Sequence, residues 1–159
     1  MAQLTEKIAV ITGGAGGIGQ AAAKQFTAEG ARVVLVDREE TALQSVVRSL
    51  GEDVASYVVA DVTKSEQVQG YVNEAVQRWG GIDILLANAG IEGVVSSIAD
   101  YPLAMFEQVM AVNVVGVWLG LKYIIPVMRE RGGGSIVITS STAGIGGTAG
   151  MSAYTTSKH

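Results

Sequence analysis

The sequence contains no cysteine, and its one histidine is His159. Disulfide bonds and thiolate metal sites are therefore excluded. A zinc site usually needs several histidine or cysteine ligands, so we expect no metal centre. A chain without cysteine is compatible with a reducing compartment, and we expect a cytoplasmic location.

Positive charge and long apolar runs are also scarce. The chain has 11 Lys and Arg residues against 15 Asp and Glu, a formal net charge of −4, and no basic cluster. Nucleic-acid binding needs a basic stripe, so we expect none. The most apolar stretch, 109–121, is interrupted by Asn113 and is shorter than the roughly 20 residues that span a bilayer. We expect it to form a buried helix, with no membrane span.

Aliphatic residues and glycine are abundant instead. Hydrophobic residues make up 48% of the 159 positions, aromatics only 6%, and there are 21 glycines. This composition is typical of an α/β protein with buried parallel strands, and the length corresponds to one domain.

Short runs rich in Val and Ile alternate with segments of helical period. The runs predict strands at 7–12, 32–36, 54–60, 82–87 and 135–139. The other segments predict helices at 18–29, 39–50, 65–79 and 102–131. Thr63 and Glu66 fit a capping box for the third helix. Such alternation implies parallel strands with right-handed crossovers. We therefore predict a Rossmann-like doubly wound parallel sheet of about five strands, forming one α/β domain over 1–159.

A glycine-rich turn, Thr12–Gly19, lies between the first strand and the first helix. Gly13 and Gly17 would let the backbone turn sharply and approach a pyrophosphate, and Gly19 would let helix and strand pack closely. The helix adds free N–H groups and the positive end of its dipole. A plain flexible turn also uses glycine, but the position between strand and helix favours dinucleotide binding.

Two acidic residues follow the second and third strands. Asp37 comes 18 positions after Gly19, close to the spacing of about 20 at which an acidic residue accepts hydrogen bonds from the adenosine ribose. Its charge would repel a 2′-phosphate, which favours NAD over NADP. Arg38 is either a solvated turn residue or a phosphate contact. Asp61 either contacts the adenine or starts the turn before Thr63.

Asn88, Ala89 and Gly90 follow the fourth strand. The Asn88 side chain could bridge neighbouring strand ends, and Gly90 would leave room for a cofactor. An ordinary turn is the alternative. Asn113 interrupts an apolar helix, and a buried amide needs hydrogen-bond partners. Asn113 could bond a neighbouring backbone or hold a water behind Lys158, and the two roles are compatible.

Tyr154 and Lys158 are four positions apart, so a helix would place them on one face. A free tyrosine has a pKa of about 10 and is a poor base at neutral pH. An ammonium about 4 Å away stabilises a phenolate by about 4 kcal/mol at an effective dielectric near 20. Tyr154 could then exchange a proton with an alcohol or ketone oxygen, and Ser141 could hydrogen-bond that oxygen. For Tyr154 and Lys158 alone, an exposed helix pair is the alternative.

Together these residues resemble the short-chain dehydrogenase/reductase family over the whole chain. Thr12–Gly19 is similar to its Thr-Gly-x-x-x-Gly-x-Gly turn. Asn88–Gly90 is similar to the end of its Asn-Asn-Ala-Gly motif, with Ala87 in place of the first Asn. The family's catalytic tetrad is matched by Asn113, Ser141, Tyr154 and Lys158. The Tyr-x-x-x-Lys spacing argues against the enoyl-reductase branch.

The resemblance implies a dehydrogenase that uses NAD, with NADP as the less favoured cofactor, and a small alcohol or ketone substrate. The cofactor would be bound by Thr12, Gly13, Gly17, Ile18, Gly19, Asp37, Asp61, Val62, Asn88, Ala89, Gly90, Tyr154 and Lys158. Segments 91–95 and 143–151 would line the substrate pocket, which suggests a modest, uncharged substrate. Family tetramers use the helix equivalent to 105–128, so we expect a homo-oligomer, either a tetramer or a dimer.

Family members continue well beyond the position of Lys158. We therefore expect a chain truncated after its Tyr-x-x-x-Lys motif, with little activity by itself. Two alternatives stay open at this point. One is a non-catalytic NAD-binding module, and the other is an interaction protein built on the same fold.

Overall fold

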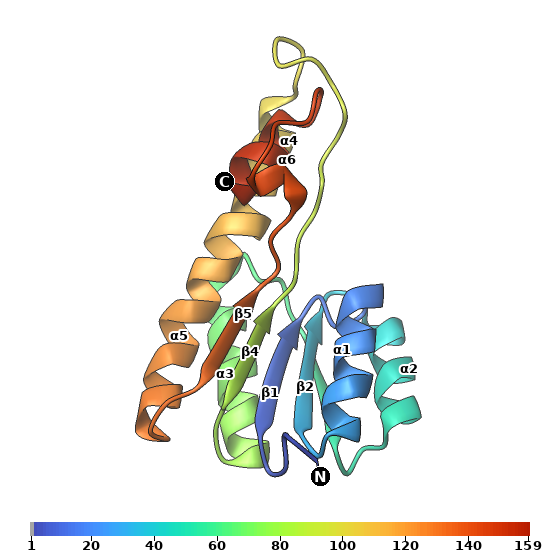
Figure 1. The fold of residues 1–159 in the computed structure, drawn as a ribbon, viewed down its shortest axis with the longest axis vertical. Helices are drawn as coiled ribbons and strands as arrows, with labels where there is room; N and C mark the ends of the chain where they lie inside the picture. The colour runs from blue at the N-terminus through green and yellow to red at the C-terminus, as the bar shows by residue number, and fades with distance from the viewer. Residues whose placement is uncertain (1) are drawn as a thin grey trace.

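The protein is described by a computed structural model that covers residues 2–159. Its centre is a parallel sheet in the order β3-β2-β1-β4-β5 (Figure 1). The strands are β1 (Ile8–Thr12), β2 (Arg32–Asp37), β3 (Ala55–Val59), β4 (Ile84–Ala87) and β5 (Ser135–Ile138). The predicted doubly wound sheet is confirmed, and each strand lies within two residues of its predicted ends.

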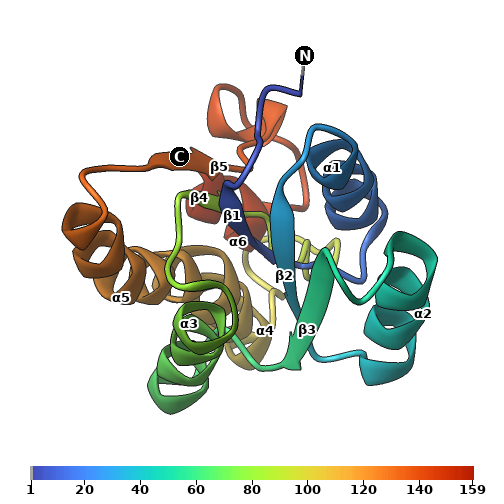
Figure 2. The same ribbon diagram turned by 90° about the horizontal axis from the view of Figure 1, so that it is seen from below.

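Helices cover both faces of the sheet (Figure 2). One face carries α1 (Gly17–Ala28) and α2 (Glu40–Leu50), and the other carries α3 (Ser65–Trp79) and α5 (Val117–Glu130). Side chains alternate along β1, so that Ala9 and Ile11 face the first pair and Val10 faces the second. Burial on both faces explains the near-continuous aliphatic runs of β1, β2 and β4. The edge strand β5 is exposed along its length.

The predicted helix 102–131 is divided in the structure. It begins as α4 (Leu103–Met110), widens into a π-helix, η1 (Ala111–Gly116), and continues as α5. A 3₁₀-turn, η2 (Thr142–Gly144), and the short helix α6 (Ser152–Lys158) complete the elements. Both α4 and α6 project beyond the carboxyl edge of the sheet (Figure 1). The sequence pattern did not reveal the π-turn.

The predicted capping box before α3 is wrong. The residue that precedes α3 is Lys64, and no side chain caps the helix there. The Thr63 hydroxyl donates instead to Asp61 Oδ1 over 2.8 Å. The same Asp61 oxygen accepts the Thr63 N–H over 2.9 Å, which is the group that the Glu66 side chain would have accepted in a capping box.

The continuous helical run Leu103–Glu130 is longer than the apolar stretch considered above. Its 28 residues are enough, by length and composition alone, to cross a membrane. Core helices of folded proteins pass the same test. Ile124 and Met128 on this run are buried against the sheet, as in a core helix.

The buried carboxylate of Asp83, the residue just before β4, joins β4, β1 and the end of α5 at the amino edge of the sheet. Asp83 accepts the Ile8 N–H over 3.0 Å. It also accepts two bonds of 3.2 Å from the Arg131 guanidinium, which lies just after α5. A buried backbone N–H needs an acceptor, so Asp83 stabilises the start of β1 and fastens the end of α5 to it.

We predict that Asp83→Ala lowers the free energy of unfolding by about 2–3 kcal/mol, because it leaves a buried N–H and a guanidinium without an acceptor. Urea denaturation would measure the loss. Lys7→Ala is the control. The Lys7 Nζ lies 3.9 Å from Asp83 and its side chain is 53% exposed, so its removal should cost less than about 1 kcal/mol. Equal losses in the two variants would contradict the prediction.

Candidate functional site

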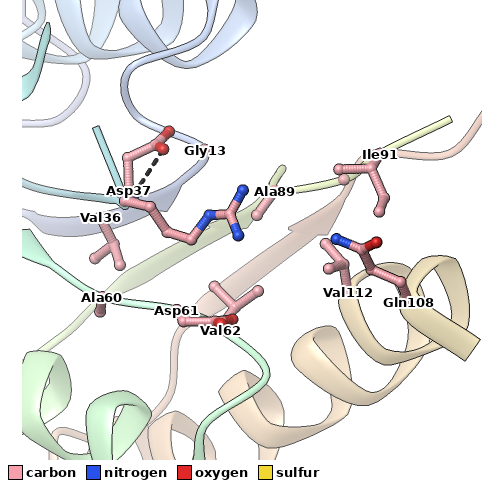
Figure 3. A pocket seen from close by; sticks show the side chains of 12 residues that line it. Gly13, Val36, Asp37, Ala60, Asp61, Val62, Ala89, Ile91, Gln108 and Val112 are labelled. Atoms are coloured by element: carbon pink, nitrogen blue, oxygen red, sulfur yellow. Dashed lines mark hydrogen bonds between the residues drawn. The ribbon is translucent and has the colours of Figure 1, made fainter. Parts of the chain in front are cut away.

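A hollow of about 130 Å³ opens at the carboxyl ends of β1 to β4 (Figure 3). This edge is where open parallel sheets bind ligands. The hollow is lined by Gly13, Val36, Asp37, Arg38, Ala60, Asp61, Val62, Ala89, Gly90, Ile91, Gln108 and Val112. Six predicted cofactor residues are in this set: Gly13, Asp37, Asp61, Val62, Ala89 and Gly90.

The glycine turn closes tightly on itself between β1 and α1. Gly13 has a φ of +66°, in the left-handed region. A Cβ at Gly19 would collide with the Gly13 carbonyl oxygen and lie 2.9 Å from Gly14 Cα. Glycine is therefore required at position 19 because the backbone of the turn itself, at Gly13 and Gly14, lies against it. We had predicted that the close contact would be between the helix and the strand. A Cβ at Gly17 would meet no other described residue within 4 Å, so the first turn of α1 faces open space.

Asp37 fastens the glycine turn to the end of β2. Its Oδ2 accepts the Ala15 N–H over 3.0 Å, and its Oδ1 accepts the Arg38 N–H over 2.7 Å. The same side chain lines the hollow (Figure 3). Asp37 thus has a structural role besides the predicted contact with a ribose.

Asp61 starts the turn that follows β3. Its Oδ1 accepts the Thr63 N–H over 2.9 Å as well as the Thr63 hydroxyl. Partial burial raises the pKa of the Asp61 carboxyl, but these hydrogen bonds and the charges of Arg38 and Lys64 outweigh burial and lower it overall. The carboxylate also lines the hollow, so the turn role and the predicted adenine contact are compatible.

Thr12 and Asn88 hold the strand ends together beneath the hollow. The Thr12 hydroxyl accepts the N–H groups of Asn88 and Ala89 over 3.0 and 3.1 Å. The Asn88 amide donates to the Thr12 carbonyl over 3.2 Å and accepts the Thr139 hydroxyl over 3.1 Å. The predicted bridging of strand ends by Asn88 is confirmed, from β1 to the end of β5.

Several lining residues were missed by the sequence analysis. Val36 is the last but one residue of β2, and Ala60 directly follows β3. An apolar residue at these positions carries no distinctive signal. Gln108 and Val112 line the opposite wall, and their spacing of four on one helix was the available signal. Ile18, a predicted cofactor contact, is 63% exposed at the start of α1.

Tyr154 and Lys158 both lie on α6, as their spacing predicted. The Lys158 Nζ donates to the Thr139 carbonyl over 2.8 Å and lies 5.7 Å from the centroid of the Tyr154 ring. Burial lowers the pKa of the Lys158 ammonium. A Cβ built on Gly90 would lie 3.9 Å from Lys158 Nζ, so the lysine lies directly over the turn after β4.

Ser141 and Asn113 lie on the elements around α6. The Ser141 hydroxyl accepts the Ala143 N–H over 3.1 Å and so caps η2, which packs against α6. Asn113 lies in η1 and is 6% exposed. It accepts the Ile91 N–H and donates to the Ile91 carbonyl, both over 2.9 Å. The predicted structural bond from Asn113 to a neighbouring backbone is confirmed.

The sheet order and the hollow at its carboxyl edge define a Rossmann-like α/β protein. A family model described as short chain dehydrogenase matches residues 7–159. The chain belongs to the short-chain dehydrogenase family. It is 44% identical to short-chain dehydrogenase reductase 3a of Arabidopsis thaliana, over 99% of this chain and 62% of that protein. It is 43% identical to momilactone A synthase of Oryza sativa subsp. japonica, over 99% and 58%.

Solved structures show the same relationship. A crystal structure of levodione reductase superposes with a TM-score of 0.93 at 38% identity, over 99% of this chain and 62% of that one. The structure of NAD+-bound xylitol dehydrogenase superposes with a TM-score of 0.95 at 37% identity, over 98% and 61%. The chain therefore spans about 60% of the length of these relatives.

Two glycine variants would test the turn geometry. We predict that Gly19→Ala lowers the free energy of unfolding by about 2 kcal/mol, because its methyl group overlaps backbone that must shift. Gly17→Ala should change it by less than about 1 kcal/mol, because the added methyl enters open space and alanine favours a helix. Thermal and urea unfolding would measure both. A larger loss in Gly17→Ala than in Gly19→Ala would contradict the turn described above.

Proposed function

We propose that the chain carries the cofactor site and catalytic residues of an NAD-dependent oxidoreductase that interconverts a secondary alcohol and a ketone. The observation that carries the proposal is the Tyr154–Lys158 pair on α6, held over the strand ends by the Lys158–Thr139 hydrogen bond of 2.8 Å. Membership of the short-chain dehydrogenase family supports it. So do relatives named levodione reductase and xylitol dehydrogenase.

The residues at the carboxyl edge fit NAD. The open first turn of α1, next to Gly17, offers unpaired N–H groups and the positive helix end to a pyrophosphate. Asp37 would accept hydrogen bonds from the adenosine ribose. Asp61 and Val62 would meet the adenine in the hollow that they line. The bound cofactor would supply the hydride as NADH or accept it as NAD+.

The chain's own residues would handle the proton and the developing charge on the substrate oxygen. The Tyr154 hydroxyl would give a proton to a ketone oxygen or take one from an alcohol. The Lys158 ammonium would stabilise the phenolate and contact the nicotinamide ribose. The Ser141 hydroxyl would donate a hydrogen bond to the reacting oxygen, and Asn113 would hold a water behind Lys158.

The preference for NAD over NADP rests on Asp37. Its carboxylate lies at the end of β2, where a 2′-phosphate would be repelled. Arg38 lines the same hollow and offers a positive charge, so the preference should be moderate in size.

Oligomer state and location belong to the same proposal. Val115 and Trp118 are exposed on the η1–α5 run, and we propose that this surface forms a subunit contact in a dimer or tetramer. We propose a cytoplasmic location, with which the cysteine-free composition is compatible.

The cofactor preference predicts a change in the ratio of two dissociation constants. NAD should bind more tightly than NADP. Asp37→Asn should lower the dissociation constant of NADP relative to that of NAD about tenfold, because it removes the repelling charge and keeps a hydrogen-bond acceptor. Calorimetric titration would measure both constants. Asp100→Asn, at an exposed loop carboxylate, is the control. NADP binding as tight as NAD in the unaltered protein would contradict the preference.

Tyr154→Phe tests the catalytic role in the complete gene product. Loss of the hydroxyl should lower kcat about 100-fold or more, because it removes the group that exchanges the proton. NAD binding should change little, since the adenosine end of the site is formed by other elements. Assays with simple secondary alcohols and ketones at 340 nm would measure it. Full turnover in Tyr154→Phe would refute the assigned chemistry, whereas a protein that binds NAD without any turnover would support a non-catalytic module.

A further inference from the structure

Ser157 lies one residue before Lys158 and joins the short helix α6 to the π-turn. Its Oγ is 2.9 Å from Asn113 Nδ2 and 2.8 Å from the Tyr154 carbonyl oxygen. An amide nitrogen can only donate, so Ser157 accepts from Asn113. Its single proton then goes to the Tyr154 carbonyl. Both hydrogen-bonding functions of the hydroxyl are therefore used, and the sequence analysis assigned it none.

Ser157 completes the donor hydrogen bonds of the Asn113 amide, whose oxygen keeps a second lone pair for the water proposed above. The Asn113 amide accepts from Ile91 N–H through its oxygen, and one of its N–H groups donates to the Ile91 carbonyl. Ser157 takes the other N–H. Because the amide is buried, losing this acceptor would leave a polar group without a partner, which is unfavourable. The side chain of Asn113 thus ties three segments together: η1, the strand-end segment at Ile91, and α6.

The short helix α6 depends on contacts outside itself: it packs against α4 and η2, and the Asn113–Ser157 bond adds a link to η1. The helix has seven residues, Ser152–Lys158, and an isolated helix of that length is not stable in water. A serine that bonds only to the carbonyl three residues back is common in helices and holds nothing outside the helix. The bond from Asn113 differs, because it crosses 44 positions of sequence and reaches the residue next to Lys158.

We infer that Ser157 is a positioning residue for the reaction proposed above: through Asn113 it holds α6 so that Tyr154 and Lys158 face the strand ends. The inference rests on the proposed function. Ser157 does not itself touch the reacting atoms. Its effect passes through the position of Lys158, whose Nζ donates to the Thr139 carbonyl.

Kinetics of the complete gene product test the role. Ser157→Ala should lower kcat about tenfold, because small displacements of catalytic groups reduce turnover steeply. The dissociation constant of ADP, which probes only the adenosine hollow, should stay within about twofold. Ser157→Thr keeps the hydroxyl and should restore most of kcat. Thr156→Ala, at the exposed neighbour on α6, should leave kcat unchanged.

A second pair of variants keeps the test valid if the alanine variant folds poorly. Ser157→Val and Ser157→Thr have nearly the same shape and differ in the hydroxyl, so they should differ in kcat by about the same tenfold factor. The Thr variant should be the faster of the two. Equal kcat in the Val and Thr variants, or in Ser157→Ala and the unaltered protein, would overturn the inference.

A readout without turnover separates this inference from the proposed function. The side-chain amide protons of Asn113, followed by NMR in the cofactor-free protein, should exchange at least tenfold faster in Ser157→Ala and Ser157→Val than in Ser157→Thr. Unchanged exchange would overturn the link itself. Faster exchange in a protein that binds ADP but turns over no alcohol or ketone would keep the link, refute the proposed function, and overturn the role of Ser157 in catalysis.

Discussion

The site depends on the contact between the ends of two central strands. The Thr12 hydroxyl accepts two consecutive N–H groups from the turn after β4. The Asn88 side-chain amide donates to the Thr12 carbonyl and accepts the Thr139 hydroxyl. Parallel strands end together, but their last residues leave backbone groups that need partners. This cross-link supplies partners and joins the glycine turn, the Asn88–Gly90 turn and the end of β5. The hollow is lined by Gly13, Ala89 and Gly90 of these turns, and Lys158 of α6 bonds Thr139 at the end of β5.

A second layer of the site is connected to these strand ends through side chains from distant parts of the chain. Asn113, in the widened turn of a long helix, bonds the Ile91 backbone and Ser157. Lys158 donates to the carbonyl of Thr139, and the side-chain hydroxyl of the same residue donates to Asn88. Lys158 is thus linked to the strand ends by a hydrogen bond, while the proposed adenosine contacts line the hollow at the sheet edge. We therefore expect substitutions in the two groups to affect turnover and cofactor binding separately.

Residues with a strong local signal were predicted well. The glycine turn, Asp37 and Asn88–Gly90 all follow strands with clear aliphatic patterns, and the structure brings Asp37, Asp61, Ala89 and Gly90 to one hollow. Residues whose role depends on contacts across the fold were missed. Gln108 and Val112 line the hollow only because α4 and η1 extend beyond the sheet. The Thr63–Glu66 capping box failed because α3 begins only at Ser65 and because Asp61 accepts the Thr63 N–H that Glu66 would have accepted.

The sequence alone determined the alternation of strands and helices, the positions of the turns, and the family, because aliphatic periodicity and glycine spacing act over a few residues at a time. The tertiary structure decided the rest. The π-turn at Asn113, the second role of Asp37 as a tie for the glycine turn, and the bond from Asn113 to Ser157 each join groups far apart in the chain. Such bonds form only when packing brings buried polar groups within reach of one another, and no local pattern records which groups will meet.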